Sequence, residues 1–143
     1  PGWRLVLPWT ALLLALELAT SAWPTHKNGA AWADAIAERA PGPVSQVLVV
    51  EDMARYSLHL ELGADVEKLS LLPIPQPAYS PEYDDDVADK LAGDYDPDAI
   101  WLTKQERFAE VQARLQQLGY VAIPRGTPFE GRTLFRVRHA GDD

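Results

Sequence analysis

Two neighbouring carboxylates follow the most continuous apolar run in the interior of the chain. Glu51 and Asp52 come directly after residues 47–50, which read Val-Leu-Val-Val. Such a run is typical of a strand that is buried on both faces at the centre of a sheet. Ligands bind α/β sheets at the carboxyl ends of the strands. We therefore predict a binding role for Glu51 and Asp52, while Asp52 also suits the N-cap of a following helix.

Tyr56 and Trp101 are the aromatic candidates for contact with a ligand. Tyr56 lies shortly after the two carboxylates, and Trp101 lies in a second apolar run, 99–102. Two rings beside strands can form a platform on which a sugar stacks, although such rings more often belong to the core. We add Tyr56 to the predicted binding residues.

The other polar side chains give no catalytic or metal-binding pattern. Asp84, Asp85 and Asp86 are consecutive, whereas a calcium loop needs alternating ligands, and three carboxylates suit the first turn of a helix. The sequence has no glycine-rich phosphate loop. The histidines lack the spacing of metal ligands. We therefore predict no catalytic residue, no metal site and no cofactor. The three histidines are His26, His59 and His139.

Composition excludes further classes of function. The formal net charge is −8, and no cluster of Lys and Arg is visible, so the chain is not expected to bind nucleic acid. The chain contains no cysteine, which excludes disulfides and thiolate metal sites. With 47% hydrophobic residues it can form one core of ordinary size.

An apolar segment, 5–23, precedes this domain. Its length is about the ~20 residues that a helix needs to cross a bilayer. Arg4 at its N-terminal flank favours a cytoplasmic N-terminus, and tryptophans near its ends suit the headgroup region. Glu17 is costly in lipid, which favours a helix packed against others in a bundle. The tryptophans are Trp3, Trp9 and Trp23.

Two other interpretations of this segment stay open. It resembles a signal peptide, with small residues at 19–22 as the cleavage site, and it is also compatible with a buried helix of a soluble protein. If the segment is a membrane helix or a signal peptide, the rest of the chain lies outside the cytoplasm. We divide the chain into 1–24, a transmembrane or leader helix, and 25–143, an extracytoplasmic domain.

Alternating helical and extended patterns predict an α/β fold for that domain. We expect a small, mostly parallel sheet with flanking helices and a β-hairpin at its C-terminal end. Thr103 and Glu106 have the spacing of a capping box, which predicts the start of the longest helix. Helices are expected at 28–40, 52–62, 87–93 and 103–118, and strands at 47–50, 69–74, 99–102, 120–123 and 133–138.

The order of these segments resembles the C-terminal end of a bacterial membrane glycosyltransferase of the family 39 type, related to protein mannosyltransferases and aminoarabinose transferases. The resemblance rests on the final apolar segment followed by NGAAWADAIAERAPG, QVLVVEDMARYSLHLELG and WLTKQERFAEVQARLQQLGY. It implies a multi-span enzyme that transfers a sugar from a polyprenyl-phosphate donor to an extracytoplasmic acceptor. It also implies that the catalytic carboxylate lies in an early loop outside this chain.

The resemblance therefore predicts an accessory domain that covers the active-site mouth or helps to recognise the acceptor. Its partners would be the membrane and, through the whole enzyme, the lipid-linked donor and the acceptor. The alternative is an exported or membrane-anchored α/β binding module without catalytic activity. A third class, a cytoplasmic regulator or nucleotide-binding domain, requires the apolar segment to be a core helix of a soluble protein.

Overall fold

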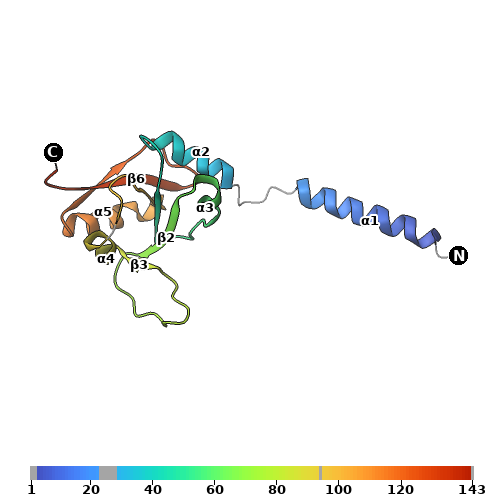
Figure 1. Ribbon diagram of the computed structural model, residues 1–143, viewed down its shortest axis with the longest axis horizontal. Coiled ribbons are helices and arrows are strands. Elements are labelled where there is room, and N and C mark those ends of the chain that lie inside the picture. Colours follow the sequence, from blue (N-terminus) through green and yellow to red (C-terminus); the bar gives the residue numbers. More distant parts are fainter. Residues whose placement is uncertain (1–2, 23–28, 94, 143) are drawn as a thin grey trace.

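The computed structural model describes residues 3–22, 29–93 and 95–142 (Figure 1). Within these ranges the chain forms five α-helices, one short 3-10 helix and six strands. The helices are α1 (Trp3–Ala22), α2 (Gly29–Arg39), α3 (Ser57–Leu62), α4 (Val87–Ala92), η1 (Gln105–Arg107) and α5 (Phe108–Gln117). The strands are β1 (Gln46–Val50), β2 (Asp65–Ser70), β3 (Asp85–Asp86), β4 (Ile100–Lys104), β5 (Tyr120–Pro124) and β6 (Arg132–His139).

All six strands belong to one mixed sheet in the order β3-β2-β1-β4-β6-β5. The pairs among β3, β2, β1 and β4 are parallel, whereas β6 is antiparallel to both β4 and β5. The expectation of a mostly parallel sheet is therefore wrong. The predicted hairpin is present as β5 and β6, and β6 adds directly to β4, so the hairpin extends the sheet antiparallel to its parallel half. As predicted, β1 lies in the interior of the sheet.

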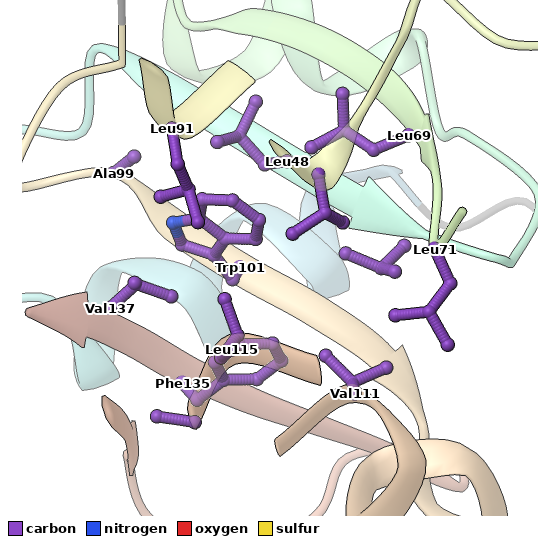
Figure 2. Close-up of a cluster of buried hydrophobic side chains, with 13 residues drawn as sticks. Leu48, Leu69, Leu71, Leu91, Ala99, Trp101, Val111, Leu115, Phe135 and Val137 are labelled. Carbon is purple, nitrogen blue, oxygen red and sulfur yellow. The ribbon is translucent and has the colours of Figure 1, made fainter. Parts of the chain in front are cut away.

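Two apolar cores cover the two faces of the sheet. On one face, α4 and α5 pack on β1, β4 and β6, and Figure 2 shows Trp101 and Phe135 in the middle of that cluster. On the other face, Trp32 and Ile36 of α2 and Leu58 of α3 pack on the opposite side of the same strands. Alternating residues of β1 divide between the cores, as the period of two in a strand requires. Leu48 and Val50 face the first core, and Val47 and Val49 face the second.

The apolar segment forms α1, which projects away from the α/β domain (Figure 1). All residues from 6 to 19 are exposed, and eight large apolar side chains in this stretch are each more than half exposed. The predicted membrane span is nevertheless not found. Among the described residues, no helix is both long and apolar enough to cross a bilayer.

Two predicted boundaries change the description of the domain. The helix expected at 52–62 begins only at Ser57, because residues 51–56 form a loop after β1. Tyr56, not Asp52, precedes its first turn. The strand expected at 69–74 instead spans Asp65–Ser70, where Val66 and Leu69 supply its buried positions.

Candidate binding site

The loop 51–56 leaves the carboxyl end of β1, which is where the sequence predicted a binding site. Glu51 has φ of 53°, in the left-handed region that side chains other than glycine rarely adopt. This conformation ends the strand and turns the chain away from the sheet. Val50 before it is fully buried, so the loop begins at the boundary between core and surface.

The Glu51 carboxylate holds three separate segments together. Its Oε1 accepts a hydrogen bond of 2.8 Å from the Leu71 amide, which follows β2. Its Oε2 lies 3.2 Å from Nη1 of Arg107 and accepts a bond of 3.3 Å from the Tyr83 hydroxyl. These contacts satisfy both oxygens and compensate for the unfavourable backbone conformation.

Asp52 is buried and pairs with Arg132 at the start of β6. The Arg132 Nε lies 2.8 Å from Oδ2, and Nη2 lies 3.4 Å from Oδ1. Burial raises the pKa of the Asp52 carboxyl, but hydrogen bonds from Arg132 and the Met53 amide outweigh burial and leave the pKa below its ordinary value. Asp52 therefore stays charged at neutral pH, and it does not cap α3.

Tyr56 and Trp101 do not form the predicted aromatic platform. Trp101 is completely buried, 6.2 Å from the ring of Phe135, whereas Tyr56 is 58% exposed. Burial raises the pKa of the Tyr56 hydroxyl, and the charge of Asp84 adds to that effect. Tyr56 thus remains a candidate contact residue, but with other neighbours.

The loop separates two surface hollows that share Met53. One, of about 300 Å³, we call the charged hollow; it contains Glu51 and Asp52 together with Lys68 and Lys104. The other, of about 310 Å³, we call the aromatic hollow; it contains Tyr56 and Trp32. The charged hollow is lined by Glu51, Asp52, Met53, Lys68, Glu82, Tyr83 and Lys104, and the aromatic hollow by Gly29, Trp32, Met53, Ala54, Arg55, Tyr56 and Ser57.

Comparison with known proteins found no relative of this chain. No family model matches it, and neither the curated proteins nor the solved structures include a significant match.

A buried tryptophan forms the floor of the aromatic hollow. Trp32 is 1% exposed, and its Nε1 donates a hydrogen bond of 2.8 Å to Glu130. Its ring meets Phe129 edge to face, with 4.9 Å between the ring centroids. The hydrogen bond to Glu130 and the packing against Phe129 hold the indole in one orientation, so its face is a rigid surface.

Arg55 covers that surface with a charged group. Its guanidinium carbon lies 4.3 Å from the centroid of the Trp32 ring, a close cation–π contact. Burial, followed by the charge of Arg132, lowers the pKa of Arg55, while Glu130 and Asp52 partly offset this effect. The side chain remains cationic, because an arginine is protonated at any physiological pH.

The acidic run before α4 has a structural explanation. Asp86 is the N-cap of α4, and its Oδ1 accepts hydrogen bonds of 2.9 Å from the Ala88 amide and 3.1 Å from the Asp89 amide. Carboxylate oxygens of Asp85, Asp86 and Asp89 lie within 4.8 Å of one another. The charge of Asp86 is the main cause that raises the pKa of Asp89. Capping accounts for this geometry without a metal ion.

The sequence predicted the carboxylates at the end of β1 but neither the loop that holds them nor the groups that contact them. The structure places Glu51, Asp52 and Tyr56 in one loop, although Asp52 and Tyr56 were expected in the helix 52–62, and the two carboxylates are engaged by Arg107 and Arg132. Both arginines are distant in sequence and carry no local signal. Trp32 and Arg55 fall within the expected helices 28–40 and 52–62, and their contact likewise depends on tertiary structure.

Proposed function

We propose that this chain is the C-terminal, non-catalytic accessory domain of a membrane glycosyltransferase that uses a polyprenyl-phosphate sugar donor. In this proposal α1 packs with other helices of the whole enzyme in the membrane, although α1 itself is not both long and apolar enough for a span, and the α/β domain lies on the extracytoplasmic side. The observation that carries the proposal is the exposure of apolar side chains all around α1.

The exposed surface of α1 is not that of a helix in water. Leu12, Leu13 and Leu14 are consecutive, so about 100° per residue places them on three sides of the helix, and each is more than half exposed. A helix that is apolar on all sides is normally buried in a large core or in a membrane. Burying one leucine is worth about 1.5–3 kcal/mol, so a helix with many of them strongly favours an apolar environment.

The resemblance to a membrane glycosyltransferase indicates that the apolar environment of α1 is a membrane. An apolar helix followed by α2, β1, the loop and α3, and later by β4 and α5, is the order that resembles the end of a family 39-type glycosyltransferase. Glu17 lies within α1, where packing against neighbouring helices would shield a carboxylate better than lipid would.

The state of the candidate residues supports an accessory role. A general acid or base must be free to exchange a proton with the substrate, and its pKa should lie near the working pH. Asp52 is held by Arg132 with a lowered pKa, and both Glu51 oxygens accept hydrogen bonds. These carboxylates shape the loop, which suits binding better than catalysis.

The decisive experiment starts with the reading frame upstream of Pro1. We expect it to encode several further spans, with an acidic residue in the first external loop. Membranes that contain the full protein should then transfer sugar from a polyprenyl-phosphate donor, and removal of residues 29–143 should lower the rate. A start codon just before Pro1 would refute the proposal.

Topology gives an independent test of the same proposal. Alkaline phosphatase fused after Asp143 of the full protein should be active, because it folds only outside the cytoplasm, and a fluorescent protein at the same position should be dark. The opposite pattern would place the domain in the cytoplasm and favour a regulatory role.

A second candidate is an exported or anchored binding module without transferase activity. The aromatic hollow favours it, because that hollow is formed entirely within this chain. Intact transfer activity after removal of residues 29–143, or a short reading frame with one span, would select this candidate.

A further inference from the structure

The aromatic hollow combines a cation with an apolar wall. Arg55 lines it together with Trp32, Met53 and Tyr56. Among the described residues, no hydrogen bond or ion pair engages the Arg55 guanidinium; its close contact is the ring of Trp32. By contrast, Arg107 and Arg132 of the same site both pair with carboxylates. Arg55 therefore keeps hydrogen-bond donors available to a ligand.

The N–H donors of the Arg55 guanidinium suit an oxyanion as ligand. The guanidinium group presents its N–H groups in a planar fork that fits phosphate or carboxylate oxygens. Glu130 and Asp52 act on Arg55 through their charges, but neither forms an ion pair with it, so its donors stay available within a chain of net charge −8. The cation–π contact with Trp32 restricts the Arg55 side chain and so reduces its loss of freedom on binding.

The exposed apolar side chains at the edge of the hollow suit a hydrocarbon chain next to that anion. Met53 is 75% exposed and Tyr56 58% exposed, although both are large and largely apolar. Leu60, one turn further along α3 from Tyr56, is 86% exposed. An exposed apolar group of this kind beside a pocket marks a binding surface.

The position of the hollow indicates where such a ligand would be found. Gly29, the first residue of α2, lines it, and α1 ends at Ala22. Seven peptide units span at most about 27 Å, so the hollow stays close to the end of α1. If α1 lies in a membrane, the hollow lies within that distance of the end of α1 and so within reach of the headgroup region.

We propose that the aromatic hollow binds an anionic amphiphile. The oxyanion of the headgroup lies on the Arg55 guanidinium, and the adjoining apolar chain lies against Met53 and Tyr56. This inference deepens the proposed function and rests on it for the presence of a membrane. It assigns to this domain a contact with anionic lipid that is separate from the insertion of α1.

The test measures binding of the full chain to vesicles of phosphatidylcholine, with and without phosphatidylglycerol. Arg55→Gln is compared with Arg138→Gln, which removes the same charge from an exposed position near the end of β6. The wild type should prefer the anionic vesicles. Arg55→Gln should lose about fivefold in that preference, since one cation at the surface is worth about 1 kcal/mol, and Arg138→Gln should keep it.

A second pair of variants tests the apolar part. Tyr56→Ser should weaken binding to the anionic vesicles, whereas Tyr79→Ser, which changes an even more exposed tyrosine in the loop before β3, should not. Both substitutions lie on the surface, so neither should prevent folding. Equal effects of the two would overturn the assignment of the hollow.

Competition with inorganic phosphate distinguishes a lipid headgroup from a free anion as the ligand of the hollow. Phosphate should displace the wild type from anionic vesicles no better than chloride at the same ionic strength. If phosphate displaces it through Arg55, the hollow is a simple oxyanion site and the amphiphile is refuted.

The outcomes also distinguish this inference from the proposed function. A wild-type chain that binds neither kind of vesicle would overturn the membrane role of α1. A chain that binds both kinds equally, or an Arg55→Gln variant that behaves like Arg138→Gln, would overturn only the headgroup site.

Discussion

Arg132 binds the Asp52 carboxylate through two nitrogens, although the two residues are 80 positions apart in the chain. Nε and Nη2 lie 2.8 Å and 3.4 Å from the two carboxylate oxygens. The contact joins the loop after β1 to the first residue of β6, on the far side of β4. Because the Asp52 side chain is only 5% exposed, this ion pair is shielded from water on one side. It fixes the loop that separates the two hollows.

Replacing Asp52 by Asn should destabilise the domain. The variant keeps the size of the side chain but leaves Arg132 beside a neutral amide, which we expect to lower the free energy of unfolding by about 2 kcal/mol. Urea denaturation measures this change.

Asp98→Asn is the matched control, because it breaks the ion pair between Asp98 and Arg136, in which the Asp98 side chain is 67% exposed. A surface pair of this kind contributes about 0–1 kcal/mol. Equal losses in the two variants would show that the Asp52 pair has no special role.

The stabilising effect of Asp52 should depend on pH. Its pKa is lowered in the folded state, so the carboxylate stabilises the fold above the ordinary pKa of about 3.9, and the effect is lost as the pH falls through the folded-state pKa. The difference in free energy of unfolding between wild type and Asp52→Asn should therefore be constant near neutral pH and shrink in acid. A difference that grows in acid would contradict the direction of the shift.

Glu51 offers a test of backbone strain against side-chain contacts. Glu51→Ala removes the acceptor for the Leu71 amide and the partner of Arg107 but keeps the left-handed φ of 53°. Glu51→Gly loses the same contacts and relieves the strain, which costs about 1 kcal/mol in a residue with a side chain. Both variants should be less stable than wild type, with glycine the milder by about 1 kcal/mol in thermal unfolding. A more harmful glycine would mean that the strain is negligible.

Local patterns predicted those parts of the fold that local physics determines. The apolar run 47–50 predicted β1, because the burial of that strand follows from consecutive apolar residues. The hairpin of β5 and β6 was likewise found. The position of β6 beside β4 was not found, because the pairing of distant strands leaves no trace in either segment alone.

The same distinction explains the candidate site. The rule that ligands bind at strand ends singled out Glu51 and Asp52 from sequence, but the loop 51–56 to which they belong was expected to be helical from Asp52 on. Its geometry depends on Arg107 and Arg132, which arrive from other elements, and on the pairing of Arg55 with Trp32. The predicted cap at Asp52 failed because the same carboxylate has a stronger partner in Arg132.

Thr103 provides a last test, because the sequence and the structure assign it different roles. The capping-box pattern predicts that Thr103 begins a helix with Glu106, but the residue lies in β4 and is completely buried. Its Oγ1 donates a hydrogen bond of 3.0 Å to the Val50 carbonyl on the neighbouring strand β1. Thr103→Val keeps the shape and removes this bond, which should cost about 1 kcal/mol. Glu106→Ala, on the exposed surface, should change stability by less than about 0.5 kcal/mol.

Hydrogen exchange locates the effect of these substitutions. Loss of the Thr103 bond should speed amide exchange in β1 and β4, which are paired from Val47 with Ile100 to Val50 with Thr103, and leave the first turn of α5 unchanged. If instead both Thr103→Val and Glu106→Ala speed exchange at the start of α5, the two residues act as a cap, and the position of Thr103 in the sheet is refuted.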